Sequence, residues 1–349
     1  METDVVIVGG GLSGLALGDM LHRAGREFVV IEARDRLGGR IEVSRDGAAF
    51  DLGPSWFWPG HDRMAALVAR LGLSVFAQYD RGAGVYEDAA GQVFRAPGVA
   101  SMAGSLRVQG GMAAVIDGLA MQFPGERVLL GRAVKRVHRQ GVALSDGSPV
   151  AARHVVLALP PRAAATLRFD PPLASAAMGA MAGIPTWMAG QAKFVATYDT
   201  AFWRAAGLSG DGASQRGPLG EIHDASAADG RPGALFGLVA TPPEGRDADL
   251  VPLALAQLAR MFGDAALTPR QTVLRDWASQ PFTATPADHA PMSHHPAYGL
   301  PTILRDLWDG TLHLGSTEVA PEFGGFLEGA LCAAEMVAAR ILARPADKA

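Results

Sequence analysis

The sequence predicts an α/β fold in which a parallel-sheet domain is interleaved with a second, mixed-sheet α+β domain. Three observations predict it. Residues 5–8 form an apolar, β-branched run that suits a buried parallel strand, and a glycine-rich turn follows it. Helical apolar spacing then begins at Leu15. The chain has 349 residues, which is enough for two domains of roughly 100–200 residues each.

Composition and charge narrow the class of protein. Hydrophobic residues make up 49% of the chain and charged residues 19%, which indicates a well-buried globular protein. A formal net charge of −4 gives no basic surface for nucleic acid. One cysteine, Cys332, leaves no internal disulfide and suits a reducing cytoplasm. No apolar run approaches a membrane span, and strand-like sequence from Asp4 leaves no room for a signal peptide, so we expect a cytoplasmic protein.

The first strand and helix enclose a nucleotide-binding pattern. Gly9, Gly11 and Gly14 fit G-x-G-x-x-G, in which glycines let the backbone approach a pyrophosphate at a helix N-terminus. A second strand, residues 28–31, ends in Glu32, whose carboxylate can accept ribose hydroxyls. A glycine-rich turn alone is weak evidence, but here strand, helix, second strand and acid are all in place. The sequence thus predicts a Rossmann-type dinucleotide site, with NAD and FAD both open.

The residues after the second strand favour FAD. Arg34 is followed by RLGGRI, which contains Gly39 and Arg40. This stretch resembles the extended FAD signature of the flavin amine oxidase family, the group of monoamine and polyamine oxidases. The resemblance implies that the glycines and Arg40 cover the diphosphate, because a guanidinium offers forked donors to phosphate oxygens. FDLGPSWFWP (50–59) resembles the family segment that passes under the flavin, where Gly53 permits close backbone approach.

A second FAD motif stands near the other end of the chain. LHLGSTEVAPEFGGFLEGALCAAEMVAARIL (312–342) resembles the family's C-terminal motif over its whole length. Free N–H groups at Gly325, Phe326 and Leu327 would face the flavin pyrimidine edge at the positive end of the helix. The resemblance implies further cofactor contacts at Val134, Trp277, Gly315 and Ser316. Two motifs in the family's order indicate a Rossmann-type FAD-binding domain and a flavoenzyme.

The remaining sequence is divided between the two domains. A helix at 61–72, a hairpin at 84–95 and a helix at 250–262 are expected from apolar periodicity and turn residues. We expect the FAD-binding domain to comprise residues 1–60, 106–169 and 311–349. The substrate domain is then expected at residues 61–105 and 170–310.

Lys193 opens KFVATYDTAFWR, a run that otherwise predicts a buried strand. A lysine there loses hydration free energy unless something compensates it. One interpretation is a packed stem whose amine reaches solvent. The run also resembles the family segment in which a strand lysine hydrogen-bonds through a water to flavin N5. That resemblance implies a catalytic Lys193, with a lowered pKa, that helps order water or dioxygen during flavin reoxidation.

Candidate substrate contacts depart from the family pattern. Trp56, Phe326 and His289 are the residues we assign to the substrate. Many family members frame the amine between two tyrosines, but Phe326 stands at one of these positions and PFTATPADHAP (281–291) contains no tyrosine. The flavin-linking cysteine of the monoamine oxidases is also missing there, so FAD is expected to bind non-covalently. His289 belongs to a Pro-rich segment, which indicates a loop rather than a metal site.

Three functions remain open at this point. The first is oxidation of an amine C–N bond by hydride transfer to flavin N5, with dioxygen as acceptor and peroxide as product. The alternative is an FAD-dependent dehydrogenase or desaturase of the same fold that acts on a non-amine substrate. The third is a non-enzymatic FAD-bound interaction protein, which no feature specifically supports.

The length of the linker after the hairpin affects the size of substrate that we expect. Longer family members carry a helical insertion that roofs the cavity, but here only APGVASMAGSLRVQ (96–109) separates the hairpin from the Gly110-Gly111 landmark. Such a linker is too short and too rich in small residues for a multi-helix lid. We therefore expect an open flavin face, or one closed by a second copy in a homodimer. An open site favours a bulky amine over a small one.

Overall fold

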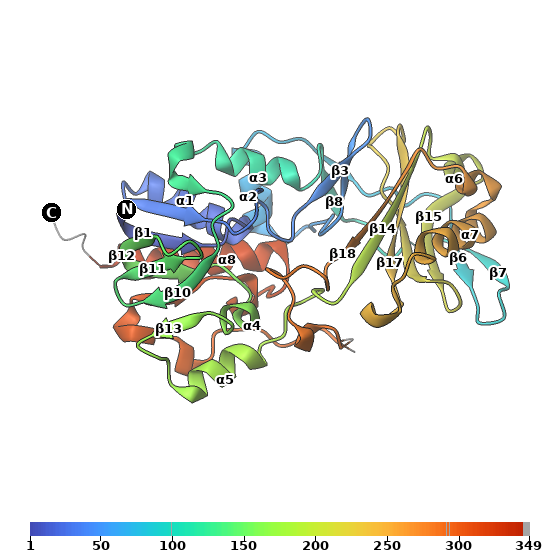
Figure 1. Ribbon diagram of the computed structural model, residues 1–349. Helices are drawn as coiled ribbons and strands as arrows, with labels where there is room; N and C mark the ends of the chain where they lie inside the picture. Colours follow the sequence, from blue (N-terminus) through green and yellow to red (C-terminus); the bar gives the residue numbers. More distant parts are fainter. Residues whose placement is uncertain (99, 291, 293, 345–349) are drawn as a thin grey trace.

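The computed structural model describes residues 1–98, 100–290, 292 and 294–344. Figure 1 shows two lobes, with the N-terminus and the last helix, α8 (Leu327–Leu342), in the lobe that holds the first sheet. That sheet has eight strands in the order β13-β10-β11-β12-β1-β2-β9, and β19 pairs with β12. Its strands are β1 (Glu2–Val8), β2 (Phe28–Ile31), β9 (Val128–Leu129), β10 (Val134–His138), β11 (Gly141–Leu144), β12 (Pro149–Leu157), β13 (Arg168–Asp170) and β19 (Leu312–Leu314).

Alternating side chains of β1 explain why this sheet is covered on both faces. β1 pairs in parallel with β2 and with β12. Val5 and Ile7 face a core made with the helices α1 (Leu12–Arg23), α2 (Asp62–Arg70), α3 (Ala113–Ala120) and α8 (Leu327–Leu342). Val6 and Val8 face the opposite core, to which α4 (Pro161–Ala164) and α5 (Ser175–Gly183) contribute. A strand that is apolar on both faces is typical of a parallel sheet between helical layers.

The second sheet has seven strands in the order β18-β14-β17-β16-β15-β6-β7. Its strands are β6 (Ala83–Glu87), β7 (Val93–Pro97), β14 (Ala192–Tyr198), β15 (Leu208–Ser214), β16 (Leu219–Asp224), β17 (Gly233–Val239) and β18 (Gln271–Asp276). On one face Phe194 and Ala196 pack in a core with α6 (Phe202–Ala205) and α7 (Leu250–Phe262). On the other face Val195 and Phe236 pack against Phe50. The second face therefore looks toward the first lobe (Figure 1).

Short elements complete the fold. Two small antiparallel pairs join β3 (Val43–Arg45) to β4 (Ala49–Asp51) and β5 (Val75–Ala77) to β8 (Leu106–Val108). Short 3-10 helices lie at Gly125–Arg127, Pro243–Gly245, Asp264–Leu267, Pro286–Asp288, Thr302–Leu304, Leu307–Gly310 and Thr317–Val319. Within the described residues, no helix is long and apolar enough to cross a membrane.

Several expected elements are present. The helix expected at 61–72 is α2, the hairpin at 84–95 is β6–β7, and the helix at 250–262 is α7. Between Pro97 and Leu106, residues 98 and 101–104 form turns, and no helix is found among the described residues of this linker. The two sheets thus draw on segments that alternate along the chain. The division into domains at the boundaries expected from the sequence stays a prediction.

Glu328 joins the first turn of α8 to the start of α2. Its carboxylate is 1% exposed and accepts the N–H of Arg63 at 3.0 Å and the N–H of Met64 at 2.9 Å. A helix N-terminus leaves its first N–H groups without intrahelical partners, so this contact satisfies two of them.

We expect Glu328→Ala to lower the free energy of unfolding by about 1–3 kcal/mol, because it leaves two backbone donors unpaired. Glu335→Ala on the same helix is the matched control. Its carboxylate is 47% exposed and makes one ion pair with Arg63, so the expected loss is about 0–1 kcal/mol. Urea unfolding followed by circular dichroism measures both, and equal losses would contradict this account of the helix junction.

Candidate active site

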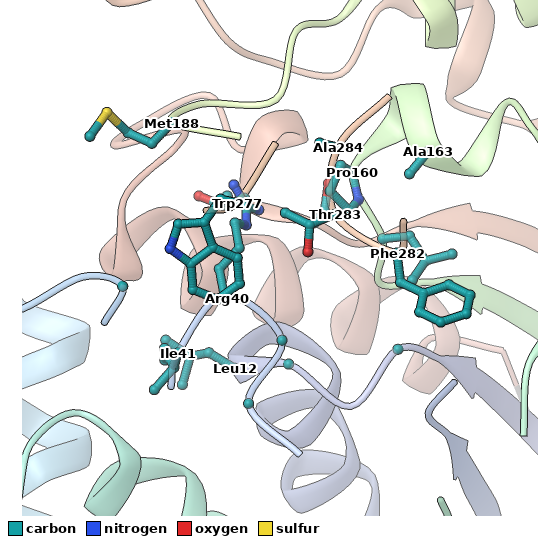
Figure 2. Close-up of a pocket in the computed structure, with 18 of the residues that line it drawn as sticks. Leu12, Arg40, Ile41, Pro160, Ala163, Met188, Trp277, Phe282, Thr283 and Ala284 are labelled. Carbon is teal, nitrogen blue, oxygen red and sulfur yellow. The ribbon is translucent and has the colours of Figure 1, made fainter. Parts of the chain in front are cut away.

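A cavity of about 1310 Å³ lies between the two sheets and is lined from both. Figure 2 shows Leu12 and Ile41 from the first lobe on one side of it. Phe282 and Ala163 lie together on another side, away from Met188. A volume of this size exceeds what a small substrate alone would fill and suits a dinucleotide together with a substrate.

The glycine-rich turn between β1 and α1 forms one wall. A Cβ at Gly14 would lie 2.0 Å from the carbonyl oxygen of Gly9, so only glycine fits there. Gly11 is the N-cap of α1. Because glycine has no side chain, no cap side chain accepts a hydrogen bond from the first N–H groups of this helix. Ser13 Oγ donates to the carbonyl of Gly315, which fastens the two glycine-rich segments together. Gly9 and Gly11 line the cavity.

Glu32 fixes the end of β2 beside this turn. Its carboxylate is 4% exposed and accepts the N–H of Gly10 at 2.8 Å and the N–H of Arg34 at 2.9 Å. Arg34 Nη2 donates to Thr283 Oγ1 at 2.9 Å. Glu32, the acid expected at the ribose, is therefore held in the cavity wall. Arg34 connects it to the segment around Thr283, which also lines the cavity.

Arg40 is paired rather than free. Its Nη1 lies 2.7 Å from Glu318 Oε1, whose side chain is fully buried. Gly39 and Arg40 both line the cavity. The guanidinium that we expected to cover the diphosphate thus reaches the cavity with its position set by Glu318.

Lys193 is buried and held by the turn that follows β4. Its side chain is 4% exposed, and Nζ donates to the carbonyl of Gly53 at 3.0 Å and to Ser55 Oγ at 2.7 Å. The ring centroid of Phe236 lies 3.7 Å from the same nitrogen. A Cβ at Gly53 would lie 1.9 Å from the carbonyl oxygen of Arg40, so the turn is closely packed against the glycine-rich segment.

Burial sets the charge of this lysine. Desolvation lowers the pKa of Lys193 to about 7, which the nearby Asp51 carboxylate opposes and the Arg107 guanidinium assists. Burial in turn raises the pKa of Asp51, whose Oδ1 accepts the N–H of Met112 at 2.8 Å. Lys193 is therefore an amine that lines the cavity and changes charge near neutral pH.

The C-terminal motif supplies the opposite wall. Ser316, Gly325, Phe326 and Leu327 all line the cavity, whereas Gly315 lies just behind them in contact with Ser13. Phe326 is the N-cap of α8 and gives no side-chain cap, so the positive end of this helix is directed at the cavity. The positive end of a helix stabilises a negative charge that lies close to it.

The other expected contacts divide into two groups. Val134, Trp56 and Trp277 line the cavity, and Trp277 Nε1 donates to the carbonyl of Leu52 at 2.9 Å. His289 does not line it. Its Nδ1 lies 3.7 Å from Glu244 Oε1, so the structure does not bring His289 to the other substrate residues. The sequence could not predict where the His289 side chain points, because the Pro-rich segment around it has no strand or helix periodicity. The other expected site residues lie on strands or next to glycine turns, where the local pattern predicts their position.

Sequence reasoning missed four residues that the fold brings to this site. Ser55 and Trp58 stand in the same FDLGPSWFWP segment as Gly53 and line the cavity. Phe236 and Glu221 lie on β17 and β16 and also line it. Only Ser55 and Trp58 had a sequence signal, namely their place in that segment. Among the described residues, no group of three or more His, Cys, Asp or Glu side chains could hold a metal ion.

Comparisons with known proteins agree with this geometry. The profile of the family described as flavin containing amine oxidoreductase matches residues 12–98 and 83–342. A Mycobacterium tuberculosis protein named as a flavin-containing monoamine oxidase, AofH, is 28% identical over 97% of this chain and 96% of its own. The putrescine oxidase of Kocuria rosea is 44% identical over 25% of this chain and 18% of its own.

Solved structures share the fold. Putrescine oxidase bound to putrescine superposes with a TM-score of 0.82 at 24% identity, over 99% of this chain and 100% of that one. Cyclohexylamine oxidase from Brevibacterium oxydans gives 0.81 at 22% identity, with the same coverage. The predicted amine oxidase-like α/β fold is confirmed, and the first sheet, expected to be parallel, also contains the antiparallel pairs β10–β11 and β11–β12. The alignment with AofH extends over 449 positions, so that relative carries segments without a counterpart in these 349 residues.

We expect Gly14→Ala to be purified without bound flavin, because the new Cβ would meet the Gly9 carbonyl and force the turn apart. Gly179→Ala is the matched control, since Gly179 lies in α5 and a Cβ there meets nothing within 4 Å. The ratio of visible to ultraviolet absorbance of the purified proteins measures flavin content. A fully loaded Gly14→Ala protein would contradict the role of this turn.

Proposed function

The chain belongs to the flavin containing amine oxidoreductases, and from that premise we propose that it oxidises the C–N bond of an amine with non-covalently bound FAD. The proposed acceptor is dioxygen and the proposed second product is hydrogen peroxide. FAD would take a hydride at N5 from the carbon next to the amine nitrogen. Of the observations above, the buried Lys193 at the cavity supports this proposal best. Burial lowers its pKa to about 7, and strongly shifted pKa values are concentrated at the functional sites of enzymes.

The wall residues fit a bound FAD. Gly9, Gly11 and Gly14 leave room for a diphosphate at the free N-terminus of α1, and Glu32 presents a fixed carboxylate for ribose hydroxyls. We propose that Arg34, Gly39, Arg40, Gly53, Val134, Trp277, Gly315, Ser316, Gly325, Phe326 and Leu327 also hold the cofactor. The uncapped start of α8 would stabilise negative charge on the reduced ring.

Aromatic side chains would orient the substrate. Trp56, Trp58 and Phe326 line the cavity, and the rings of Trp58 and Phe326 stand at 90° with centroids 6.4 Å apart. Walls of this kind hold an apolar body and leave the reacting carbon in a fixed place. We propose a bulky amine, because no helical lid is found among the described residues of the linker 98–105.

One observation favours the alternative of a dehydrogenase or desaturase with a non-amine substrate. No tyrosine is among the described residues that line the cavity, as expected from the sequence, whereas many family members frame the amine between two. The buried lysine favours the oxidase. We further propose that the protein acts in the cytoplasm, and that a homodimer is the assembly in which a second copy would cover the open side of the cavity.

We expect an anaerobic panel of amines to bleach the bound flavin, with bulky, peptide-like or polycyclic amines faster than benzylamine. Peroxide should form when air is admitted. The panel should include a non-amine desaturation substrate. Bleaching by that compound alone, with none by any amine, would favour the alternative and contradict the proposal.

We expect Lys193→Met to retain FAD but to slow flavin reoxidation by dioxygen. The ammonium would stabilise the negative charge that develops on dioxygen, so the wild-type rate should fall as pH rises through about 7. Lys135→Met, an exposed lysine at the cavity rim, is the matched control and should reoxidise normally. Stopped-flow absorbance measures both. If Lys193→Met reoxidises its flavin at the wild-type rate and with the wild-type pH profile, the proposed role in reoxidation is wrong and the lysine is only structural.

We expect acid precipitation to leave all of the yellow colour in the supernatant. Cys332, the sole cysteine of the sequence, is buried within α8 and does not line the cavity. No thiol is therefore placed to form a bond with the flavin. Colour that stays in the washed pellet would show a covalent link.

A further inference from the structure

The hydrogen-bond partners of Lys193 carry no charge. Its Nζ donates to the carbonyl of Gly53 and to Ser55 Oγ, and the centroid of the Phe236 ring lies 3.7 Å from the same nitrogen. Within the described part of the chain, this amine forms no ion pair with a carboxylate. Burying a charge without an ion pair costs free energy, so the proton on Lys193 depends on charges that do not touch it.

Arg107 is a second buried basic residue in the same region. It stands on β8 and is 5% exposed, and its two terminal nitrogens donate to the carbonyls of Ser226 at 2.7 Å and Ala225 at 2.8 Å. Ala225 packs in the same core as Phe236, so Arg107 and Lys193 border one cluster of side chains. A guanidinium stays protonated at neutral pH, and neutral carbonyls do not balance its charge, so it needs a carboxylate nearby.

Asp51 is the carboxylate that lies near both basic groups. It ends β4, two residues before the Gly53 carbonyl that Lys193 binds, and it is 5% exposed. Its Oδ1 accepts the N–H of Met112 at 2.8 Å, which fixes the side chain. Burial lowers the pKa of Arg107 and the pKa of Lys193, and the Asp51 carboxylate opposes both shifts. Two buried basic groups thus share one carboxylate.

Asp224 does not replace Asp51 as the partner of Arg107. Its carboxylate also acts on Arg107, but two hydrogen bonds, at 2.9 and 3.0 Å, join it to the guanidinium of Arg204. Trp203 Nε1 donates to the same carboxylate at 2.8 Å. Because Arg204 neutralises Asp224, the carboxylate left for Arg107 is Asp51.

Other charged residues on the strands around Lys193 are paired among themselves. Arg275 on β18 is the register partner of Lys193 and forms an ion pair with Glu42. Beyond β17, on β16, Glu221 Oε2 lies 3.7 Å from His223 Nε2. The Glu221 side chain is also 62% exposed, so water screens its charge. Neither carboxylate is therefore placed to balance a proton on Lys193.

We propose that Arg107 and Asp51 are positioning residues that keep Lys193 partly uncharged at the cavity. Arg107 takes the Asp51 carboxylate as its counter-ion, so Lys193 has to hold its proton beside a neutral carbonyl and a hydroxyl. Neither Arg107 nor Asp51 lines the cavity, so both act through Lys193 rather than on a ligand. This inference rests on the proposed oxidase, because it assigns the groups that set the pH range in which Lys193 assists flavin reoxidation.

The experiment follows the titration of Lys193 in the holoenzyme by NMR, with ¹³C at lysine Cε. We expect Arg107→Gln to raise the midpoint above the wild-type value of about 7, by about 1 unit, since Asp51 then balances Lys193 alone. Asp51→Asn should lower the midpoint by a similar amount, because asparagine keeps the acceptor for Met112 but loses the charge. The pH profile of flavin reoxidation should move in the same two directions.

Arg26→Gln is the matched control. The Arg26 side chain is only 10% exposed, but it pairs with Asp4 at 2.7 Å and does not line the cavity. This variant removes the same charge from the protein and should leave the midpoint of Lys193 at about 7.

An unchanged midpoint in Asp51→Asn, or shifts of the same sign in Asp51→Asn and Arg107→Gln, would overturn the inference, because lost packing has no opposite sign for opposite charges. If one of the two variants does not fold, the direction of the shift in the other decides. If no amine is oxidised, the proposed function fails separately, since the titration of Lys193 does not depend on turnover.

Discussion

The two hydrogen bonds of Lys193 hold the second sheet against the glycine-rich wall of the cavity. The lysine stands on β14, and its partners, the Gly53 carbonyl and Ser55 Oγ, belong to the turn after β4. Gly53 in turn leaves no space between that turn and the carbonyl of Arg40. One side chain thus connects a cavity-lining strand of the second sheet to the segment expected beneath the flavin. Displacing it would alter both the shape and the charge of the cavity.

Keeping an amine there has a cost in stability. An unfolded lysine titrates near pH 10.4, whereas burial holds the pKa of Lys193 to about 7 in the folded protein. Between these two pH values the unfolded chain binds the additional proton. The contribution of this group to the free energy of unfolding therefore rises with pH across that window and is least favourable below pH 7. The buried Asp51 carboxylate offsets part of this cost, and Arg107 adds to it.

Local patterns in the sequence predicted the wall of the cavity that we expect to hold the cofactor, whereas the opposite wall depends on long-range strand register. The glycine motif, Glu32 and the start of α8 are short segments whose geometry follows from neighbouring residues, and the structure places them around one cavity. Lys193 could be placed on a strand, but its partner Ser55 lies 138 residues away. Glu221 reaches the cavity through the pairing of three strands and a bulge, which no local pattern encodes. His289 was assigned by proximity in sequence to the flavin region, and its loop carries it to Glu244 instead.

The most direct test of the account is the pKa of Lys193 in the folded holoenzyme. The sequence contains three lysines, Lys135, Lys193 and Lys348, so the protein labelled with ¹³C at lysine Cε should give three resolvable signals. The Lys193→Met variant assigns one of them. The account predicts that this signal titrates with a midpoint of about 7. A Lys193 signal that titrates near the ordinary value of about 10.4 would contradict the buried, cavity-facing amine on which the account depends.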